Sequence, residues 1–195
     1  MYNQADLDLN GDGQTDLTDN ACGDLPNITL DKTVLGVVAN ADGTFTVSYQ
    51  ITVSNNGGAT GIYTLVDEAA FDDDVTILNG GFTISTGGPA LAGQFTGDPS
   101  PLTLVANQEI AAGATHTFVI DYRASLDLSD NSTDGGDNVY TSCADATGGN
   151  GSEPGQGLFN MASLDLNGDG TADLTDDVCV DVPTADLSAH QACEQ

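Results

Sequence analysis

The chain has 195 residues, which is enough for one β-sandwich with additional arms. It carries 30 acidic residues against two basic ones, for a formal net charge of -28. Nucleic acid is excluded as a partner because its charge has the same sign, and no apolar run is long enough for membrane insertion. The excess of acids favours either divalent-cation binding or an environment of high salt.

The first segment, residues 1–26, repeats the end of the chain. Residues 2–26 align without gaps with residues 159–183, with 16 identities in 25 positions. We interpret residues 1–26 as the closing segment of a preceding repeat, which serves as a linker or a donated strand. Residues 27–183 are then one β-sandwich repeat unit, and residues 184–195 are a C-terminal tail.

A run of acidic and amide residues within this segment, DLNGDGQTDLTD, has the spacing of a calcium-binding loop. Calcium prefers six to eight oxygen ligands at about 2.3–2.6 Å, and alternate residues of a tight loop direct their oxygens inward. An Asp in place of the usual Glu at the last position predicts weak affinity, about 10⁻⁴–10⁻³ M. The alternative is an acidic hairpin turn without a metal. The predicted ligands are Asp8, Asn10, Asp12, Gln14 through its backbone carbonyl, Asp16 and Asp19, with Gly13 at the sharp turn.

The body between the two copies has the alternating pattern of β-strands. Strands are expected at 28–35, 44–54, 61–67, 74–86, 101–106 and 115–122, and turns at 40–43, 55–58 and 79–81. No helical periodicity is present, so we expect an all-β Greek-key sandwich with a calcium-loop β-hairpin at its end. The residues predicted to share one strand face are Phe45, Val47, Tyr49, Ile51 and Val53 in one strand, and His116, Phe118, Ile120 and Tyr122 in another.

Two further groups of acids are interpreted as solvated loops, with cation binding as the alternative. The two groups are Asp67, Glu68, Asp72, Asp73 and Asp74, and then Asp127, Asp130, Asp134 and Asp137.

The region 129–157 is rich in Gly, Asp, Asn and Ser, and we expect it to be a long ordered loop held by a disulfide.

The second copy of the calcium-type loop keeps every element of the first. It is flanked by residues 159–164 and 178–182, which we predict to be strands, so the loop is expected to join a β-hairpin. The predicted ligands are Asp165, Asn167, Asp169, Thr171 through its backbone carbonyl, Asp173 and Asp176.

Four cysteines without a C-x-x-C spacing favour disulfides in an oxidising compartment over a zinc or redox site. A bond between Cys143 and Cys179 would hold the Gly-rich loop against the final strand. Cys22 occupies the place of Cys179 in the repeat, so it is left to pair with Cys193 or with another chain. Free buried thiols are the alternative for this second pair.

Several motifs in the body carry a family resemblance. They are L-x-K-T-V at 30–34, Y-x-I-T-V-x-N at 49–55, G-x-Y-x-L-x-D at 61–67, I-A-A-G-A-T-H-T-F at 110–118, and N-x-A-S-L with T-D-D-x-C between 160 and 179. Over nearly all of residues 27–183 the chain resembles the tandem conserved repeat domain of bacterial cell-surface proteins. The resemblance implies an immunoglobulin-like sandwich in tandem arrays on cell surfaces, without catalysis and with a pair like Cys143–Cys179. The calcium-type loop departs from it, since the usual ending there is a plain hairpin.

We therefore expect an extracellular structural module of a surface or filament protein, stabilised by calcium, whose partners are copies of itself or neighbouring repeats of the same protein. An enzyme is not expected, because His116 lies in an alternating strand, His190 lies in a polar tail, and no aromatic platform marks an acid pair. One alternative is a dockerin-like calcium-dependent protein-binding module, but dockerin loops lie close together and are followed by helices. The other is a ligand-binding adhesin domain.

Overall fold

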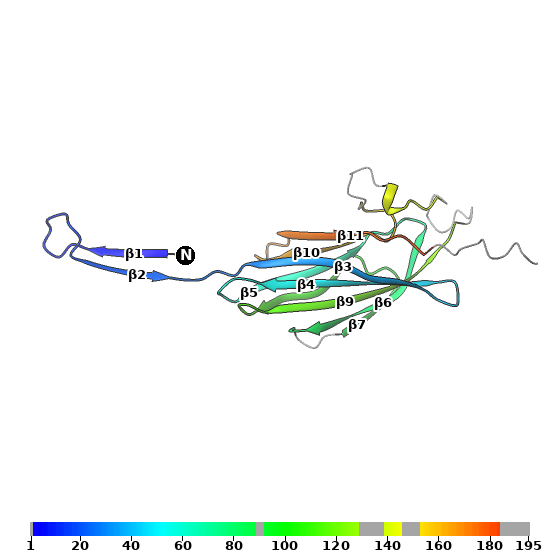
Figure 1. The fold of residues 1–195 in the computed structure, drawn as a ribbon, viewed down its shortest axis with the longest axis horizontal. Coiled ribbons are helices and arrows are strands. Elements are labelled where there is room, and N and C mark those ends of the chain that lie inside the picture. The colour runs from blue at the N-terminus through cyan, green and yellow to red at the C-terminus, as the bar shows by residue number, and fades with distance from the viewer. Residues whose placement is uncertain (1, 89–91, 129–138, 146–152, 184–195) are drawn as a thin grey trace, which may run out of the picture.

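The computed structural model describes residues 2–88, 92–128, 139–145 and 153–183. Nine of its strands form two antiparallel sheets that pack face to face as a sandwich, which confirms the all-β immunoglobulin-like prediction (Figure 1). The strands are β1 (Tyr2–Leu7), β2 (Leu17–Cys22), β3 (Ile28–Ala39), β4 (Phe45–Asn55), β5 (Gly61–Ala69), β6 (Val75–Thr86), β7 (Ala92–Thr96), β8 (Leu102–Ile110), β9 (Thr115–Leu126), β10 (Asn160–Asp165) and β11 (Leu174–Val178).

The chain passes back and forth between the two sheets. One sheet has the order β3-β4-β9-β6-β7, and the other has the order β11-β10-β5-β8. The chain crosses from β4 to β5, returns to β6, crosses again to β8 and returns to β9. Strands β3 and β11, at neighbouring edges of the two sheets, lie side by side.

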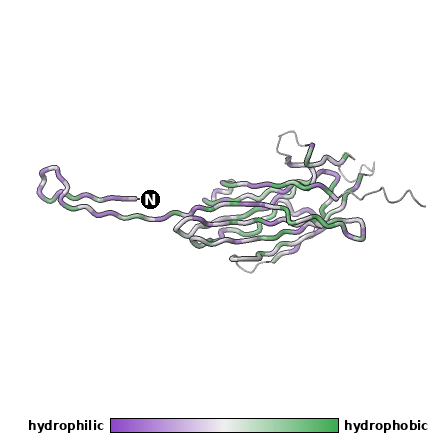
Figure 2. The backbone as a smooth tube through the Cα atoms, viewed as in Figure 1, coloured by the Kyte–Doolittle hydropathy of each residue, from purple (hydrophilic) through white to green (hydrophobic). Residues whose placement is uncertain are grey.

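The core lies between the sheets and consists of the side chains that point inward from every second residue of a strand. The alternating residues of β4 from Phe45 to Val53 are all buried, and so are the predicted positions of β9, as expected. Figure 2 shows hydrophobic and hydrophilic positions alternating along these strands. Burial of one face of each strand against the other sheet is the main source of stability for such a sandwich.

The turn predicted at 79–81 is wrong, because these residues continue strand β6 through a register shift between Ile77 and Asn79. A Cβ atom on Gly80 would lie 2.1 Å from the carbonyl oxygen of Asp121. The glycine is therefore needed for close packing of β6 on β9, where the sequence pattern indicated a turn. Strand β7 was also not predicted, whereas the turns at 40–43 and 55–58 are found between strands.

The β1–β2 hairpin projects away from the sandwich, to which residues 23–27 connect it (Figure 1). Every residue of both strands is exposed. The hairpin is thus ordered by its own backbone pairing rather than by a core. The predicted tail 184–195 and most of the Gly-rich region lie outside the described residues.

Candidate functional site

The β10–β11 hairpin closes the smaller sheet by pairing along β5. Asn160 lies opposite Ala69 and Leu164 lies opposite Leu65 in an antiparallel register. Asn160, Ala162 and Leu164 are fully buried and face the other sheet. The hairpin therefore forms an integral part of the sandwich.

The β1–β2 hairpin has the same internal register as β10–β11. Leu7 pairs with Leu17, as Leu164 pairs with Leu174 at the equivalent positions of the repeat. Leu7 and Leu17 are 52% and 58% exposed, whereas Leu164 is fully buried. The same hairpin thus occurs once docked and once with its apolar face in solvent. The three buried residues of β10 recur without change in β1, as Asn3, Ala5 and Leu7.

The loop of the docked hairpin winds around the carboxylate of Asp165. This carboxylate accepts backbone N–H groups from Asn167 at 3.1 Å, Gly168 at 2.7 Å and Gly170 at 2.9 Å. Asp173 accepts the N–H of Leu166, and its own N–H donates to the carbonyl of Leu164. These bonds hold Asp165 and Asp173 at the base of the loop, next to the ends of β10 and β11. The oxygens of Asn167 and Asp169 accept the N–H groups of Asp169 and Thr171.

The loop of the projecting hairpin has the same geometry. Asp8 accepts N–H groups from Asn10, Gly11 and Gly13, and Asp16 accepts that of Leu9. Gly11 and Gly13 have positive φ, as do Gly168 and Gly170 in the other copy. The turn predicted at Gly13 is therefore present, and it requires a left-handed backbone that glycine adopts without strain.

Hydrogen bonds from the loop backbone favour the ionised form of the first acid of each loop pattern, Asp8 and Asp165. The N–H groups of Gly13 and Gly11 lower the pKa of Asp8, and those of Gly170 and Gly168 lower the pKa of Asp165. The side chain and N–H of Thr171 lower the pKa of Asp169. Both loops consequently present negative oxygens at neutral pH, which is the donor type that calcium prefers.

The last predicted ligand of each loop lies in a strand instead of the loop. Asp19 is in β2 opposite Ala5, and Asp176 is in β11 opposite Ala162. Asp176 Oδ2 accepts the backbone N–H of Lys32 at 2.7 Å. Strand pairing starts earlier than predicted, at Leu174, so it includes residues that the loop pattern had assigned to the metal shell. Asp8, Asn10, Asp12, Asp16 and the carbonyl of Gln14 remain in the first loop. In the second, Asn167, Asp169, Asp173 and the carbonyl of Thr171 remain in the loop, and Asp165 is the last residue of β10, where the loop begins.

A third acidic group, between β5 and β6, could hold a metal ion. Carboxylate oxygens of Asp72, Asp73 and Asp74 lie within 4.8 Å of one another, a closeness that no other trio of acids, histidines or cysteines reaches in the described part of the chain. Asp72 and Asp74 are 1% and 2% exposed, so the interpretation as a solvated loop is wrong for these two residues, whereas Asp73 is exposed. Burial raises the pKa of Asp72, although the N–H groups of Thr141 and Asp74 act against it.

A buried polar cluster that the sequence analysis did not identify lies between β3, β5 and β10. Lys32 Nζ is 2.5 Å from Asp67 Oδ1, with both side chains fully buried. The Tyr122 hydroxyl donates to Asp67 Oδ2 at 2.5 Å, and Asn160 Nδ2 donates to the same oxygen at 3.1 Å. Asp67 is therefore also not in a solvated loop. The signal was present in the alternation, because Lys32, Asp67 and Asn160 each occupy an inward position of a strand pattern.

The disulfide between Cys143 and Cys179 is present and joins the Gly-rich region to the end of β11. The disulfide sulfur of Cys143 lies beside Gly157, where a Cβ atom would approach it to 2.5 Å. Cys22 is exposed and is free of disulfides in the described part of the chain, so it is not a buried thiol. Cys193 lies outside the described residues.

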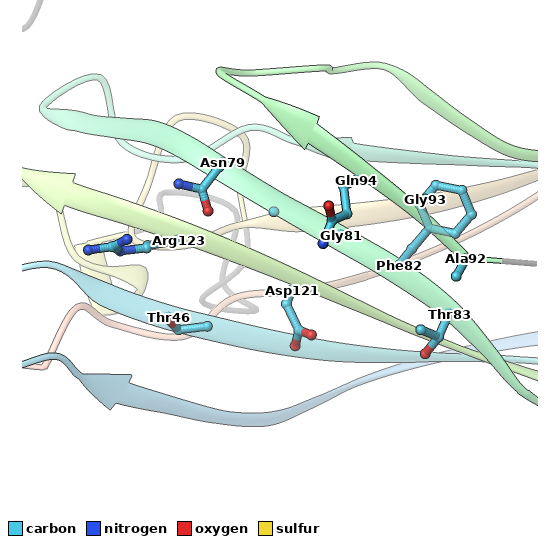
Figure 3. A pocket seen from close by; sticks show the side chains of 11 residues that line it. Thr46, Asn79, Gly81, Phe82, Thr83, Ala92, Gly93, Gln94, Asp121 and Arg123 are labelled. Carbon is cyan, nitrogen blue, oxygen red and sulfur yellow. The ribbon is translucent and has the colours of Figure 1, made fainter.

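A hollow on the outer face of the larger sheet is lined by residues of β4, β6, β7 and β9 (Figure 3). Its two charged side chains already have partners, because Arg123 forms an ion pair with Asp42 and Asp121 accepts a hydrogen bond from Ser48.

His116 is buried, and its Nδ1 atom is 2.8 Å from the Tyr63 hydroxyl. The position of His116 agrees with the predicted packing role.

Among the described residues, no helix has the length and apolar character needed to cross a membrane. No protein-family model matches the chain, and no curated protein matches it with significance.

Proposed function

We propose that the protein is an extracellular structural module of a surface or filament assembly, in which units are joined through their closing hairpins. The observation that carries this proposal is the duplicated hairpin, which is docked at 160–178 and fully exposed at 2–22 with the same register. An exposed hairpin with apolar residues on one face is an interaction surface, because burial of that face is favourable. Its partner is the closing position of another copy or of a neighbouring repeat.

The pattern of identities between the two hairpins supports this partner. Positions that face the core in β10 are identical in β1, whereas differences fall mainly at other positions, such as Gln4 for Met161 and Asp6 for Ser163. Asp176, which contacts Lys32 from β11, recurs as Asp19, and Cys179 recurs as Cys22. The projecting hairpin therefore repeats the residues by which the β10–β11 hairpin fits its docking position along β5.

Calcium is the cation that we propose for the two hairpin loops. Four oxygen-bearing side chains and one carbonyl remain in each loop, which leaves positions in the coordination shell for water. The N–H contacts to Asp8 and Asp165 order each loop backbone around its first carboxylate. The acidic trio at 72–74 is a further candidate cation site.

Disulfide bonding and the resemblance of the body to bacterial surface repeats support an extracellular location.

A full-length variant with an undocked closing hairpin tests the joining role. Ala162→Asp places a charge at a fully buried position on β10 and should empty the docking position along β5. Hairpin 2–22 of a second chain should then occupy it, so the variant should form oligomers in size-exclusion chromatography with light scattering. Cys22 would lie where Cys179 lay, and mass spectrometry should find a Cys22–Cys143 disulfide between chains.

The double variant Ala5→Asp, Ala162→Asp is the matched control, because it places the same charge on the projecting hairpin. It should remain monomeric, with circular dichroism verifying that both variants retain β-structure. A folded, monomeric Ala162→Asp variant without the Cys22–Cys143 bond would contradict the proposal.

A further inference from the structure

The cluster of Lys32, Asp67 and Asn160 brings a nucleophile, a proton carrier and a carboxamide together in the dry interior of the sandwich. Lys32 lies on β3 of one sheet, and Asp67 and Asn160 lie on neighbouring strands β5 and β10 of the other. The side chains of Lys32 and Asp67 are fully buried, and Asn160 is fully buried as well. The site is therefore shielded from water, which would otherwise solvate the amine.

The two oxygens of one carboxylate hold the amine and the carboxamide. Asp67 Oδ1 is 2.5 Å from Lys32 Nζ, while Oδ2 accepts Asn160 Nδ2 at 3.1 Å. The remaining atom of the carboxamide, Asn160 Oδ1, is buried and finds no hydrogen-bond donor among the described residues. A buried amide oxygen without a donor is rare in a stable fold, and here it belongs to the carboxamide that contacts the Asp67 carboxylate.

We propose that Lys32 and Asn160 form an intramolecular amide bond, with Asp67 as the proton carrier and ammonia as the leaving group. The reaction goes beyond the joining function, since it links the first strand of the sandwich covalently to the hairpin that occupies the docking position, whether that hairpin supplies Asn160 or, from another copy, the equivalent Asn3. Because both groups contact the same carboxylate after folding, they react as in an intramolecular reaction of high effective concentration.

The proton and electron count closes without an oxidant, a reductant or a metal. The Lys32 ammonium transfers one proton to the Asp67 carboxylate, and the neutral amine attacks Cγ of Asn160 to form the Nζ–Cγ bond. The electron pair of the C=O bond moves to Oδ1 and returns as the Cγ–Nδ2 bond breaks. Asp67 gives its proton to Nδ2, which leaves as ammonia, and then accepts the second proton from Nζ. The product is a secondary amide beside a neutral Asp67 carboxyl group.

The residues around the cluster favour the neutral form of the Lys32 amine and hold the Asp67 carboxyl group in place. Burial lowers the pKa of the Lys32 ammonium, although the Asp67 carboxylate beside it acts in the opposite direction. The Tyr122 hydroxyl donates to Asp67 Oδ2, which fixes the carboxyl group between its two partners. The Tyr49 ring packs against the amine, with 5.3 Å between Nζ and the ring centroid.

Mass spectrometry of the intact, reduced full-length protein tests the proposal. We expect a mass about 17 Da below that of the sequence, which corresponds to the loss of ammonia on amide formation. Proteolysis and fragmentation should then yield a branched peptide that joins Lys32 to Asn160. The full mass in a folded, aged sample would overturn the proposal.

Mapping of the mass loss distinguishes other chemistry. A loss of about 18 Da mapped to Lys32 and Asp67 would make Asp67 the electrophile and would contradict its role as proton carrier. A loss of ammonia mapped to a succinimide at an Asn-Gly pair, such as Asn10-Gly11, would likewise overturn the proposal.

Variants of the cluster separate the roles of its members. Lys32→Arg, Asp67→Ala and Asn160→Ala should each have the full mass, whereas Asn160→Asp should still cross-link with loss of water, about 18 Da. Asp42→Asn, which alters the exposed ion pair with Arg123, is the control and should retain the cross-link. Because wild-type protein alone gives a decisive mass, a variant that fails to fold does not affect the outcome.

Discussion

Asp176 Oδ2 accepts the backbone N–H of Lys32 at 2.7 Å and so connects the edge strand β11 of one sheet to the edge strand β3 of the other. The contact is partly buried and spans 144 residues of sequence. It removes an exposed edge, because each of these strands covers the open side of its neighbour. It also explains why Asp176 is engaged by the sandwich rather than by the loop that precedes it.

Replacement of Asp176 by Ala should destabilise the sandwich. The N–H of Lys32 would lose its acceptor, at a cost of about 1–3 kcal/mol in the free energy of unfolding. Chemical denaturation measures the change. Asp19→Ala removes the equivalent residue from the exposed hairpin and should leave the unfolding free energy of the sandwich unchanged. Equal effects of the two substitutions would show that the contact with Lys32 contributes nothing.

Calcium should stabilise the docked hairpin. If the Kd is about 10⁻³ M, a free calcium concentration ten times higher adds about 1.4 kcal/mol by mass action. Chelation should therefore lower the Tm and increase proteolysis between residues 165 and 176. Unchanged melting and proteolysis with excess chelator would contradict calcium binding in this loop.

Substitutions in the two loops should separate their effects. Asp165→Asn should abolish the calcium-dependent rise in Tm, because it neutralises the carboxylate that organises the docked loop. Asp8→Asn should leave that rise intact, since the projecting hairpin is exposed throughout. Each variant should bind one calcium fewer than the wild type by isothermal titration calorimetry. The same result for both variants in the melting experiment would argue against a structural role of the docked loop.

His116 should contribute a pH-dependent term to stability. Burial lowers the pKa of His116, so the folded state binds its proton less readily than the unfolded state does. This contribution is complete above the unfolded pKa of about 6.5 and is lost as the pH falls below it. The unfolding free energy of wild type relative to His116→Gln should therefore decrease between about pH 7.5 and about pH 5. A difference that stays constant over this range would contradict the shift.

Removal of the disulfide should have a large effect on stability. Cys143 and Cys179 are 36 residues apart, and the entropy of closing such a loop corresponds to about 4 kcal/mol. The Cys143→Ser, Cys179→Ser variant should unfold at a correspondingly lower denaturant concentration. Cys22→Ser provides the matched control, because this thiol is exposed and unpaired in the described structure. Its denaturation curve should coincide with that of the wild type.

Gly80 should tolerate no side chain. A Cβ atom would lie 2.1 Å from the Asp121 carbonyl oxygen, so Gly80→Ala should cost about 1–3 kcal/mol through overpacking. Gly36→Ala is the control, since nothing lies within 4 Å of the added atom. Denaturation of both variants measures the difference. A Gly80→Ala variant as stable as Gly36→Ala would show that β6 and β9 can separate at this point.

The sequence alone determined the fold class, the positions of most strands and the duplicated hairpin. Alternation with a period of two residues identifies the inward face of a strand, as the burial of Tyr49 and Phe118 confirms. The Cys143–Cys179 bond was also anticipated, because Cys143 begins the Gly-rich loop and Cys179 lies in the final predicted strand, so that a bond between them would hold the loop to the sheet. These features depend on local pattern or on comparison of the chain with itself.

Only the tertiary structure decided which polar residues meet. Lys32, Asp67 and Asn160 are distant in sequence, and their contact depends on which strands pair and which sheets face each other. The same is true of Gly80, whose role is set by the backbone of β9, and of Asp176, which pairs across the edges of two sheets. A sequence pattern indicates which face of a strand a residue occupies, but the residue opposite that face is fixed only when the whole chain has folded.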